Sequence, residues 1–149
     1  MQIVLAHIGP RPPARDPFET LTSTYLERIA AHARCKSESF RDESSLFTWI
    51  DRQQRRTPAL IVLLDSRGRQ LASGAFAEWL ARQRDNGAQS IVFAIGPADG
   101  WSEDSRKRAT MLLSLGPMTL AHTLARLVLA EQVYRAFTIL TGHPYHSGH

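Results

Sequence analysis

Short apolar runs alternate with longer amphipathic segments along the whole chain. Runs of aliphatic and β-branched residues predict five strands, at residues 2–8, 35–40, 59–64, 90–95 and 111–115. The runs at 59–64 (ALIVLL) and 90–95 (SIVFAI) are apolar without alternation. Such continuous runs are typical of strands that are buried on both faces of a sheet.

Helices are predicted between these strands, at residues 18–33, 44–55, 73–86, 102–108 and 122–141. The apolar stripes that should face the sheet are Leu21, Tyr25, Ile29 and Ala30 in the first helix and Leu46, Trp49 and Ile50 in the second. Ser44 and Ser102 are the expected N-caps of their helices. Gly87 and Gly142 are expected to end the third and fifth helices, and Pro144 prevents the last one from resuming.

Strands that alternate with helices of this length predict a single α/β domain over residues 1–149, with a parallel sheet and flanking helices. In open sheets of this class, ligands bind beyond the carboxyl ends of the strands. Three of the predicted ends carry glycine or proline, at residues 64–68, 96–100 and 115–117. Their convergence predicts one pocket at that edge of the sheet.

The loop at 96–100 (GPADG) could bring its backbone against a cofactor, or it could be an ordinary Pro-x-Asp-Gly turn. It lacks the G-x-G-x-x-G spacing of a dinucleotide-binding fingerprint, and no Gly-Lys-Ser/Thr follows as in a Walker loop. No Ser/His/Asp or Cys/His order stands out along the chain. The sequence therefore gives no support to nucleophilic hydrolysis.

Charge and composition indicate which partners and which cellular compartment suit this chain. The formal net charge is +4, and sixteen arginines stand against two lysines. This bias favours recognition of phosphate, or it reflects a GC-rich genome that favours arginine codons. The single cysteine, Cys35, excludes an internal disulfide and is typical of a reducing cytosol. Without an apolar run of membrane-spanning length or a basic leader, we expect a cytoplasmic protein with no membrane partner.

The long last helix carries charge on an apolar framework. Glu131 and Arg135 are spaced i,i+4 toward its apolar side, either as an ion pair that orients the helix or as part of a site. His122 begins the helix and either points into the pocket or caps a turn.

Three histidines follow in the tail, with a spacing that would allow a metal site: His143, His146 and His149. A tail that folds over the pocket is the favoured interpretation, and disorder is the remaining alternative. We expect no metal here, because no cysteine lies nearby.

Three motifs follow one another in the last third of the chain: MTLAHTLAR at 118–126, EQVYRAF at 131–137 and HPYH at 143–146. With the chain length and the strand–helix order, they resemble the C-terminal signature of the RlmH family of SPOUT-class rRNA methyltransferases. The resemblance covers the whole chain. It implies that the C-terminal part of the α/β fold is threaded into a trefoil knot, which periodicity does not predict.

The resemblance also implies a reaction and a cofactor. The reaction is methylation of N3 of pseudouridine 1915 in helix 69 of 23S rRNA, within the large subunit or the assembled ribosome. The family acts as a homodimer, and its cofactor is S-adenosylmethionine. The implied cofactor contacts are Leu64, Gly96, Leu115, Gly116, Pro117, Met118, Thr119 and Leu120.

Roles for the remaining site residues follow from the same resemblance. Tyr145 and His146 are candidates for the base or hydrogen-bonding group that assists loss of the N3 proton. Arg135 would hold the rRNA backbone or the tail. The further candidates for contact with RNA are Arg126, His122 and His143.

The chain departs from the family pattern in the loops that should face the cofactor. Pro97 stands in a loop that is usually rich in glycine, Gly116-Pro117 is unusual, and Ala121 replaces a proline. Because Pro97 removes a backbone N–H, we expect reduced affinity for S-adenosylmethionine. Two alternatives therefore stay open: an RNA- or ribosome-binding knot protein with weakened activity, and a methyltransferase that acts on another RNA nucleotide.

Overall fold

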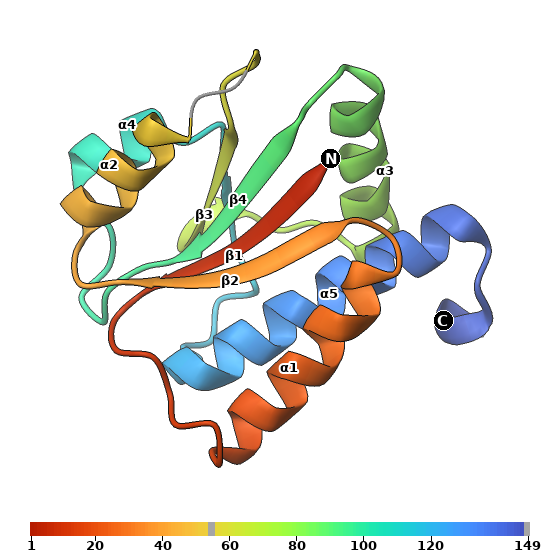
Figure 1. Ribbon diagram of the computed structural model, residues 1–149, viewed down its shortest axis with the longest axis horizontal. Coiled ribbons are helices and arrows are strands. Elements are labelled where there is room, and N and C mark those ends of the chain that lie inside the picture. The colour runs from red at the N-terminus through yellow and green to blue at the C-terminus, as the bar shows by residue number, and fades with distance from the viewer. Residues whose placement is uncertain (54–55, 148–149) are drawn as a thin grey trace.

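A five-stranded sheet runs through the middle of the protein in the order β2-β1-β4-β3-β5 (Figure 1). The computed structural model describes residues 1–53 and 56–147. The neighbouring strands pair in parallel throughout, which confirms the predicted α/β class. The strands are β1 (Gln2–Ile8), β2 (Arg34–Phe40), β3 (Leu60–Arg69), β4 (Ser90–Ile95) and β5 (Met111–Leu113).

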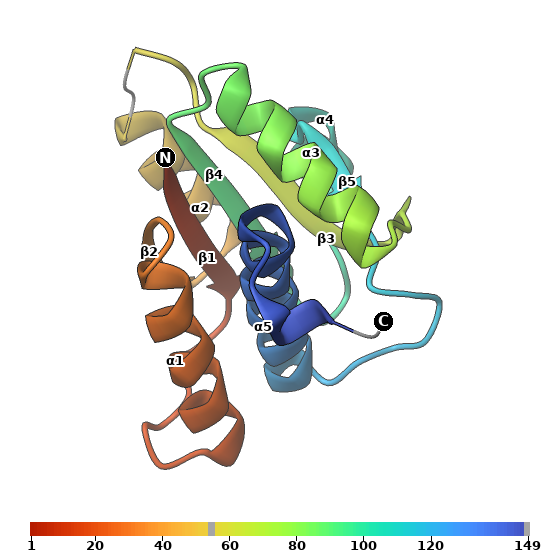
Figure 2. The same ribbon diagram turned by 90° about the vertical axis from the view of Figure 1, so that its right-hand side faces the viewer.

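Helices cover both faces of this sheet. Their bounds are α1 (Pro17–Ala30), α2 (Glu43–Arg52), α3 (Ser73–Asp85), α4 (Glu103–Arg108) and α5 (His122–Thr141), followed by a short 3-10 helix, η1 (Pro144–His146). Helices α1, α3 and α5 lie on one face, with α5 between the other two (Figures 1 and 2). Helices α2 and α4 lie on the opposite face. No helix in the described part of the chain is long and apolar enough to cross a membrane.

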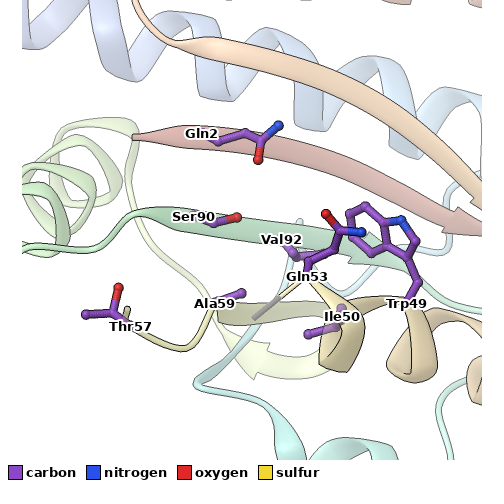
Figure 3. Close-up of a pocket in the computed structure, with 8 residues that line it drawn as sticks. All are labelled: Gln2, Trp49, Ile50, Gln53, Thr57, Ala59, Ser90 and Val92. Carbon is purple, nitrogen blue, oxygen red and sulfur yellow. The ribbon is translucent and has the colours of Figure 1, made fainter. Parts of the chain in front are cut away.

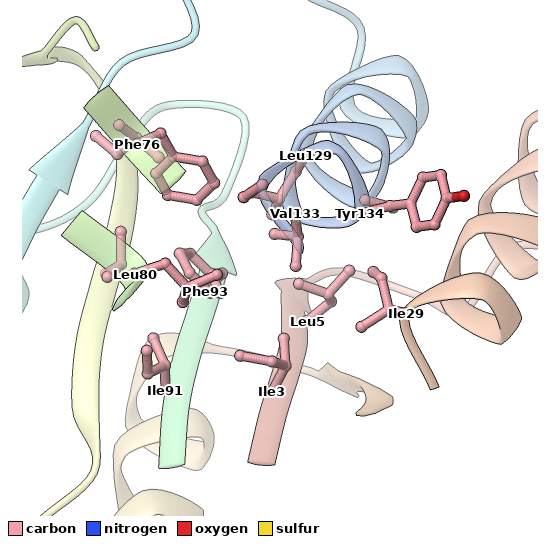
Figure 4. Close-up of a cluster of buried hydrophobic side chains, with 14 of the residues drawn as sticks. Ile3, Leu5, Ile29, Phe76, Leu80, Ile91, Phe93, Leu129, Val133 and Tyr134 are labelled. Atoms are coloured by element: carbon pink, nitrogen blue, oxygen red, sulfur yellow. The ribbon is translucent and has the colours of Figure 1, made fainter. Parts of the chain in front are cut away.

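The alternation of side chains along β1 divides the core into two layers. Ile3 and Leu5 face α1 and α5, whereas Val4, Ala6 and Ile8 face α2. Figure 4 shows α5 laying its apolar side chains over the first of these layers. Each aliphatic side chain that is fully buried in this way stabilises the fold by about 1.5–3 kcal/mol.

Two of the predicted helix termini are confirmed in detail. The Ser102 hydroxyl accepts a hydrogen bond from the Ser105 N–H and caps α4. Gly142 ends α5 in the left-handed conformation, at φ +71°, where a side chain would be strained. Glycine is therefore required at that position for the tail to turn back.

The N-cap of α2 differs from the prediction. Asp42, not Ser44, caps this helix, and its Oδ1 accepts the Ser45 N–H at 2.7 Å. A carboxylate at the cap also interacts favourably with the helix dipole, which explains why the helix begins earlier. The predicted C-terminal end near Arg55 lies outside the described residues.

The predicted end of the third strand at Leu64 is wrong, because β3 continues to Arg69 through a register shift. Gly68 makes this extension possible. A Cβ on Gly68 would lie 2.5 Å from the backbone carbon of Leu112, so only glycine lets β5 approach so closely. The edge strand β5 is correspondingly short and ends at Leu113 rather than Leu115.

The buried face of α1 differs from the predicted stripe at its two ends: Ile29 is buried and Tyr25 packs against the core as predicted, whereas Leu21 and Ala30 are exposed. Leu21 is 50% exposed, and Thr22 is buried in its place. The Thr22 hydroxyl donates to the Phe18 carbonyl at 2.7 Å, which satisfies it inside the core. A polar residue can therefore occupy the helix interface without an unpaired group.

Candidate functional site

The strands β3, β4 and β5 are neighbours in the sheet, but the predicted strand end at 64–68 lies within β3, and of the three predicted loops only the one at 115–117 lines the pocket beside β5. A pocket of about 330 Å³ opens beside the end of β5, between α3 and α5. Its walls are mainly apolar, with a few hydroxyl and amide groups. The lining residues are Gln70, Leu71, Ala72, Ser73, Phe76, Leu113, Ser114, Leu115, Gly116, Val128, Leu129 and Gln132. An apolar pocket of this size with a few polar groups is typical of a small-molecule site.

A second crevice lies on the opposite face of the sheet, between α2 and the start of β1 (Figure 3). Its volume is about 10 Å³, which is room for roughly one water molecule. This crevice is therefore no candidate for the site.

The loop after β4 is held by an indole. Trp101 is buried, and its Nε1–H donates to the Leu64 carbonyl at 2.9 Å. The indole also covers Gly96, where a Cβ would lie 2.7 Å from the ring. The Gly100 N–H donates to the Pro97 carbonyl at 2.9 Å, so the loop closes as a turn. The turn interpretation is thus confirmed, while cofactor contact by this loop stays a prediction.

The loop between β5 and α5 forms one wall of the pocket. Leu115 and Gly116 line it, and the Ser114 hydroxyl exchanges hydrogen bonds with the Gly116 backbone at 3.1 Å. The residues that follow turn outward, and Met118 is 82% exposed. Of the predicted cofactor residues, the structure therefore brings Leu115 and Gly116 to the pocket. Those that do not line it are Leu64, Gly96, Pro117, Met118, Thr119 and Leu120.

His122 joins the start of α5 to the loop after β4. Its Nε2 lies 3.2 Å from the Gly96 carbonyl, so it points toward the sheet edge rather than capping a turn. His7, near the end of β1, is 2% exposed, and its ring lies 5.6 Å from that of His122. Burial and the positive charge of Arg126 lower the pKa of His7 to about 4. His7 was not singled out in the sequence, because nothing in β1 suggests which loops it meets.

The tail is attached to the middle of α5 through Glu131. The predicted pair is present: Arg135 Nη2 and Nε donate to Glu131 Oε1 at 2.6 and 3.0 Å. The Tyr145 hydroxyl donates to the same oxygen at 2.9 Å and lies 3.1 Å from the Tyr25 hydroxyl. Arg135 Nη1 lies 3.0 Å from His146 Nδ1. One carboxylate therefore organises the whole tail.

These contacts influence the chemistry of the tail. Burial and hydrogen bonds to Tyr25 and Glu131 raise the pKa of Tyr145 well above its ordinary value. The hydrogen bonds to Glu131 also raise the pKa of Arg135. Tyr145 is therefore a neutral donor at physiological pH, and Arg135 stays charged.

A short chain of side chains connects the tail to the pocket. Gln132 lines the pocket and donates through Nε2 to Glu131 Oε2 at 2.7 Å. The Ser73 hydroxyl, on the opposite wall, donates to Gln132 Oε1 at 2.7 Å. No site role was predicted for Ser73, Gln132 or Tyr25, because their partners lie on elements that are distant in the sequence.

Arg126 does not occupy the position expected of an RNA contact. It is 5% exposed, forms an ion pair with Glu19 of α1, and donates to the Ser37 hydroxyl at 3.1 Å. These contacts give Arg126 a structural role between α5, α1 and β2. His143 is exposed, and its Nδ1 accepts the Tyr145 N–H at 3.1 Å.

The metal interpretation of the tail involves His149, which lies outside the described residues. Among residues 1–53 and 56–147, no group of three or more His, Cys, Asp or Glu side chains is arranged to hold a metal ion.

Comparison with known proteins gives consistent matches over the whole length. A family profile described as "Predicted SPOUT methyltransferase" matches residues 1–146. Ribosomal RNA large subunit methyltransferase H from Koribacter versatilis (strain Ellin345) is 49% identical over 132 residues, covering 89% of this chain and 90% of that protein. The protein of the same name from Rhodospirillum centenum (strain ATCC 51521 / SW) is 44% identical over 156 residues, covering 98% of this chain and 99% of that protein.

A solved structure resembles the fold at low sequence identity. A probable methylase family protein from Haemophilus influenzae Rd KW20 matches with a TM-score of 0.52 and 11% identity, over 97% of this chain and 67% of that one. This likeness supports the fold alone.

Proposed function

Since the chain belongs to the SPOUT methyltransferase family, we propose that it is an S-adenosylmethionine-dependent methyltransferase of large-subunit rRNA. The observation that carries the proposal is the near full-length similarity to relatives named as ribosomal RNA large subunit methyltransferases. The pocket beside the end of β5 supports it, because the predicted cofactor loop supplies one of its walls.

The finer proposal is methylation of N3 of pseudouridine 1915 in helix 69 of 23S rRNA, by a homodimer, on the large subunit or the assembled ribosome. The motifs at 118–126, 131–137 and 143–146 support this target. We also propose that the chain is threaded as a trefoil knot between β5 and α5, as the family implies.

The residues present fit a nucleoside-type cofactor. Leu71, Phe76 and Leu115 offer apolar walls for an adenine ring, and Ser73 and Gln132 offer hydroxyl and amide groups for its polar atoms. S-adenosylmethionine supplies an electrophilic methyl group on a sulfonium. We expect Pro97 and Gly116-Pro117 to lower the affinity for it, and calorimetry that detects no binding at millimolar concentration would contradict the proposed cofactor.

Transfer of a methyl group from a sulfonium needs positioning more than covalent help from the protein. The N3 imide proton of the substrate must leave, so the site needs a group that accepts it or stabilises its loss. Because Tyr145 remains a neutral donor, we assign it the role of a hydrogen-bonding group. Arg135 donates to His146 Nδ1, so the neutral ring carries its proton on Nε2, and we assign His146 too the role of a hydrogen-bonding group that stabilises loss of the N3 proton.

The decisive experiment measures the methyl content of the target nucleotide. Mass spectrometry of helix 69 from a deletion strain should show loss of the methyl group at the pseudouridine. An unchanged methyl content would refute the target and favour the alternative of another RNA nucleotide. Binding of the ribosome without any methyl transfer would favour the alternative of a binding protein with weakened activity.

The role of the tail is tested with labelled cofactor and purified ribosomes. We expect Tyr145→Phe and His146→Ala each to lower methyl transfer at least about tenfold, the scale of one lost catalytic hydrogen bond. Tyr134→Phe is the matched control, since it removes a hydroxyl from the adjacent ring, 4.8 Å from that of Tyr145, and leaves the Tyr145–Glu131 bond in place. Unchanged transfer in both tail variants would exclude the tail from the site.

A further inference from the structure

Two imidazoles lie beside the loop that follows β4. His7 pairs in register with Ile95, the residue before Gly96, and its side chain faces α5 as Ile3 and Leu5 do. His122 approaches from the first turn of α5, and the two rings meet edge to face at 67°. The pair therefore connects the N-terminal strand, the Gly96 loop and the start of α5.

The acceptors around the two rings determine their tautomers. His7 Nε2 lies 3.2 Å from the Pro10 carbonyl, and His122 Nε2 lies 3.2 Å from the Gly96 carbonyl. Because a carbonyl oxygen only accepts, Nε2 must carry the proton in both neutral rings. The Nδ1 atom of each neutral ring is then a bare acceptor. His7 Nδ1 is buried and has no hydrogen-bond partner among the described residues.

We propose that His122, with His7 packed against its ring, is a positioning residue that orients the Gly96 carbonyl for the cofactor. The inference rests on the proposed function and on the expected contact of this loop with S-adenosylmethionine. Gly96 lies outside the lining of the pocket beside β5, but it follows the carboxyl end of β4, where ligands bind in open α/β sheets. Trp101 already restrains Gly96 from the other side, so the loop is held between an indole and an imidazole. Backbone groups that are held in advance lose less freedom when a ligand binds.

The burial of His7 favours its neutral form. A proton on His7 Nδ1 would be placed in a buried position without an acceptor, and next to a cation. The charged and titratable groups that act on His7 are Arg126 and His122 on α5 and Glu19 on α1. Arg126 and His122 oppose protonation of His7, and Glu19 favours it only weakly. His7 is therefore held as a neutral ring against His122.

The tautomers can be measured without any ligand. Imidazole ¹⁵N NMR of the full chain at pH 7.5 should show a protonated Nε2 and a bare Nδ1 for both His7 and His122. An unprotonated Nε2 on His122 would overturn the proposal, since it could not then donate to Gly96. This readout is independent of the cofactor, so it distinguishes failure of the inference from failure of the proposed function.

The effect on the cofactor is measured by calorimetry with S-adenosylmethionine. His122→Ala should raise Kd about tenfold, the equivalent of one lost hydrogen bond, and raise KM for the cofactor more than it lowers kcat. His122→Gln should recover most of the affinity, because its Nε2 can donate to the same carbonyl. His32→Ala, which removes an imidazole stacked on Phe137, is the control and should leave Kd unchanged.

Each outcome of these measurements tests a different part of the proposal. If the wild type does not bind S-adenosylmethionine, the proposed cofactor is wrong. If it binds and His122→Ala binds equally well, the positioning role is wrong. If His122→Gln is as weak as His122→Ala while both retain the wild-type Tm, the hydrogen bond to Gly96 is not what positions the loop, which also overturns the inference.

Discussion

The first half of α5 and its second half are each anchored by an arginine, but in different ways. Arg126 pairs with Glu19, which lies 107 residues away, and both side chains are almost buried, at 6% and 16% exposure. Arg135 pairs with Glu131 one turn earlier on the same helix, and both are more exposed, at 18% and 19%. The first pair holds α5 to α1, whereas the second organises the tail.

This difference has consequences for stability and for function. A buried pair between elements is part of the core, and loss of either partner leaves an uncompensated charge inside the protein. A partly exposed pair within one helix contributes less, because water can solvate the remaining partner. Substitutions in the half of α5 that packs on α1 should therefore lower the stability more. Substitutions in the half that contacts the tail should lower methyl transfer more.

The largest effect is expected for Glu19→Ala. Removal of this carboxylate leaves Arg126 charged and buried, so the free energy of unfolding should fall by about 3–5 kcal/mol in urea denaturation. The double variant Glu19→Leu with Arg126→Met should recover most of the loss, since it removes both charges. A loss below about 1 kcal/mol would show that the Glu19–Arg126 pair does not stabilise the fold more than the Glu131–Arg135 pair does.

A smaller effect is expected for Glu131→Ala. Arg135, Tyr145 and Gln132 would lose their common acceptor, and the free energy of unfolding should fall by about 2 kcal/mol because the site is partly open to water. Glu78→Ala, at an exposed position of α3, is the control and should change it by less than about 0.5 kcal/mol. A larger loss than in Glu19→Ala would reverse the comparison.

The smallest effect is a pH dependence of stability that arises from His7, near the end of β1. The pKa of His7 is lowered to about 4 in the folded protein, against an ordinary value of 6.5. Between these values the unfolded chain binds the proton and the folded chain does not, so stability falls as the pH falls. From pH 6.5 to 5.5, this histidine should remove about 1 kcal/mol from the free energy of unfolding.

The measurement compares the wild type with His7→Gln, whose amide can donate to the Pro10 carbonyl but does not titrate. The difference between the two proteins should grow by about 1 kcal/mol over that pH interval, whatever the other groups contribute. A constant difference would mean that His7 is solvated enough to accept a proton in the folded state.

Most elements and several local contacts were predictable from the sequence. The strands of β1 and β4, the Ser102 cap, the Gly142 terminus and the Glu131–Arg135 pair follow from patterns within a few residues. The errors arose where a distant element decides the outcome. The extension of β3 depends on pairing with β5 at Gly68, and the burial of Thr22 in place of Leu21 depends on how α1 packs.

In the candidate site, too, local features were predictable and contacts between distant elements were not. The sequence placed Leu115 and Gly116 at a pocket and Tyr145 in a tail near α5, because glycine loops and a helix terminator mark these segments. It did not show that Trp101 reaches the Leu64 carbonyl or that Tyr25 meets Tyr145. These partners are 37 and 120 residues apart, and no local pattern encodes such a contact.

By itself, the sequence determined the α/β class, the order of strands and helices along the chain, and the family, since these depend on local periodicity and on motifs. Only the tertiary structure decided the order of strands in the sheet and therefore which loops meet at its edge. It also decided that Arg126 is buried in an ion pair with Glu19, and that His7 lies beside His122. The physical reason is that a buried charge or imidazole takes its role from its partners, and the path of the chain brings those partners to it.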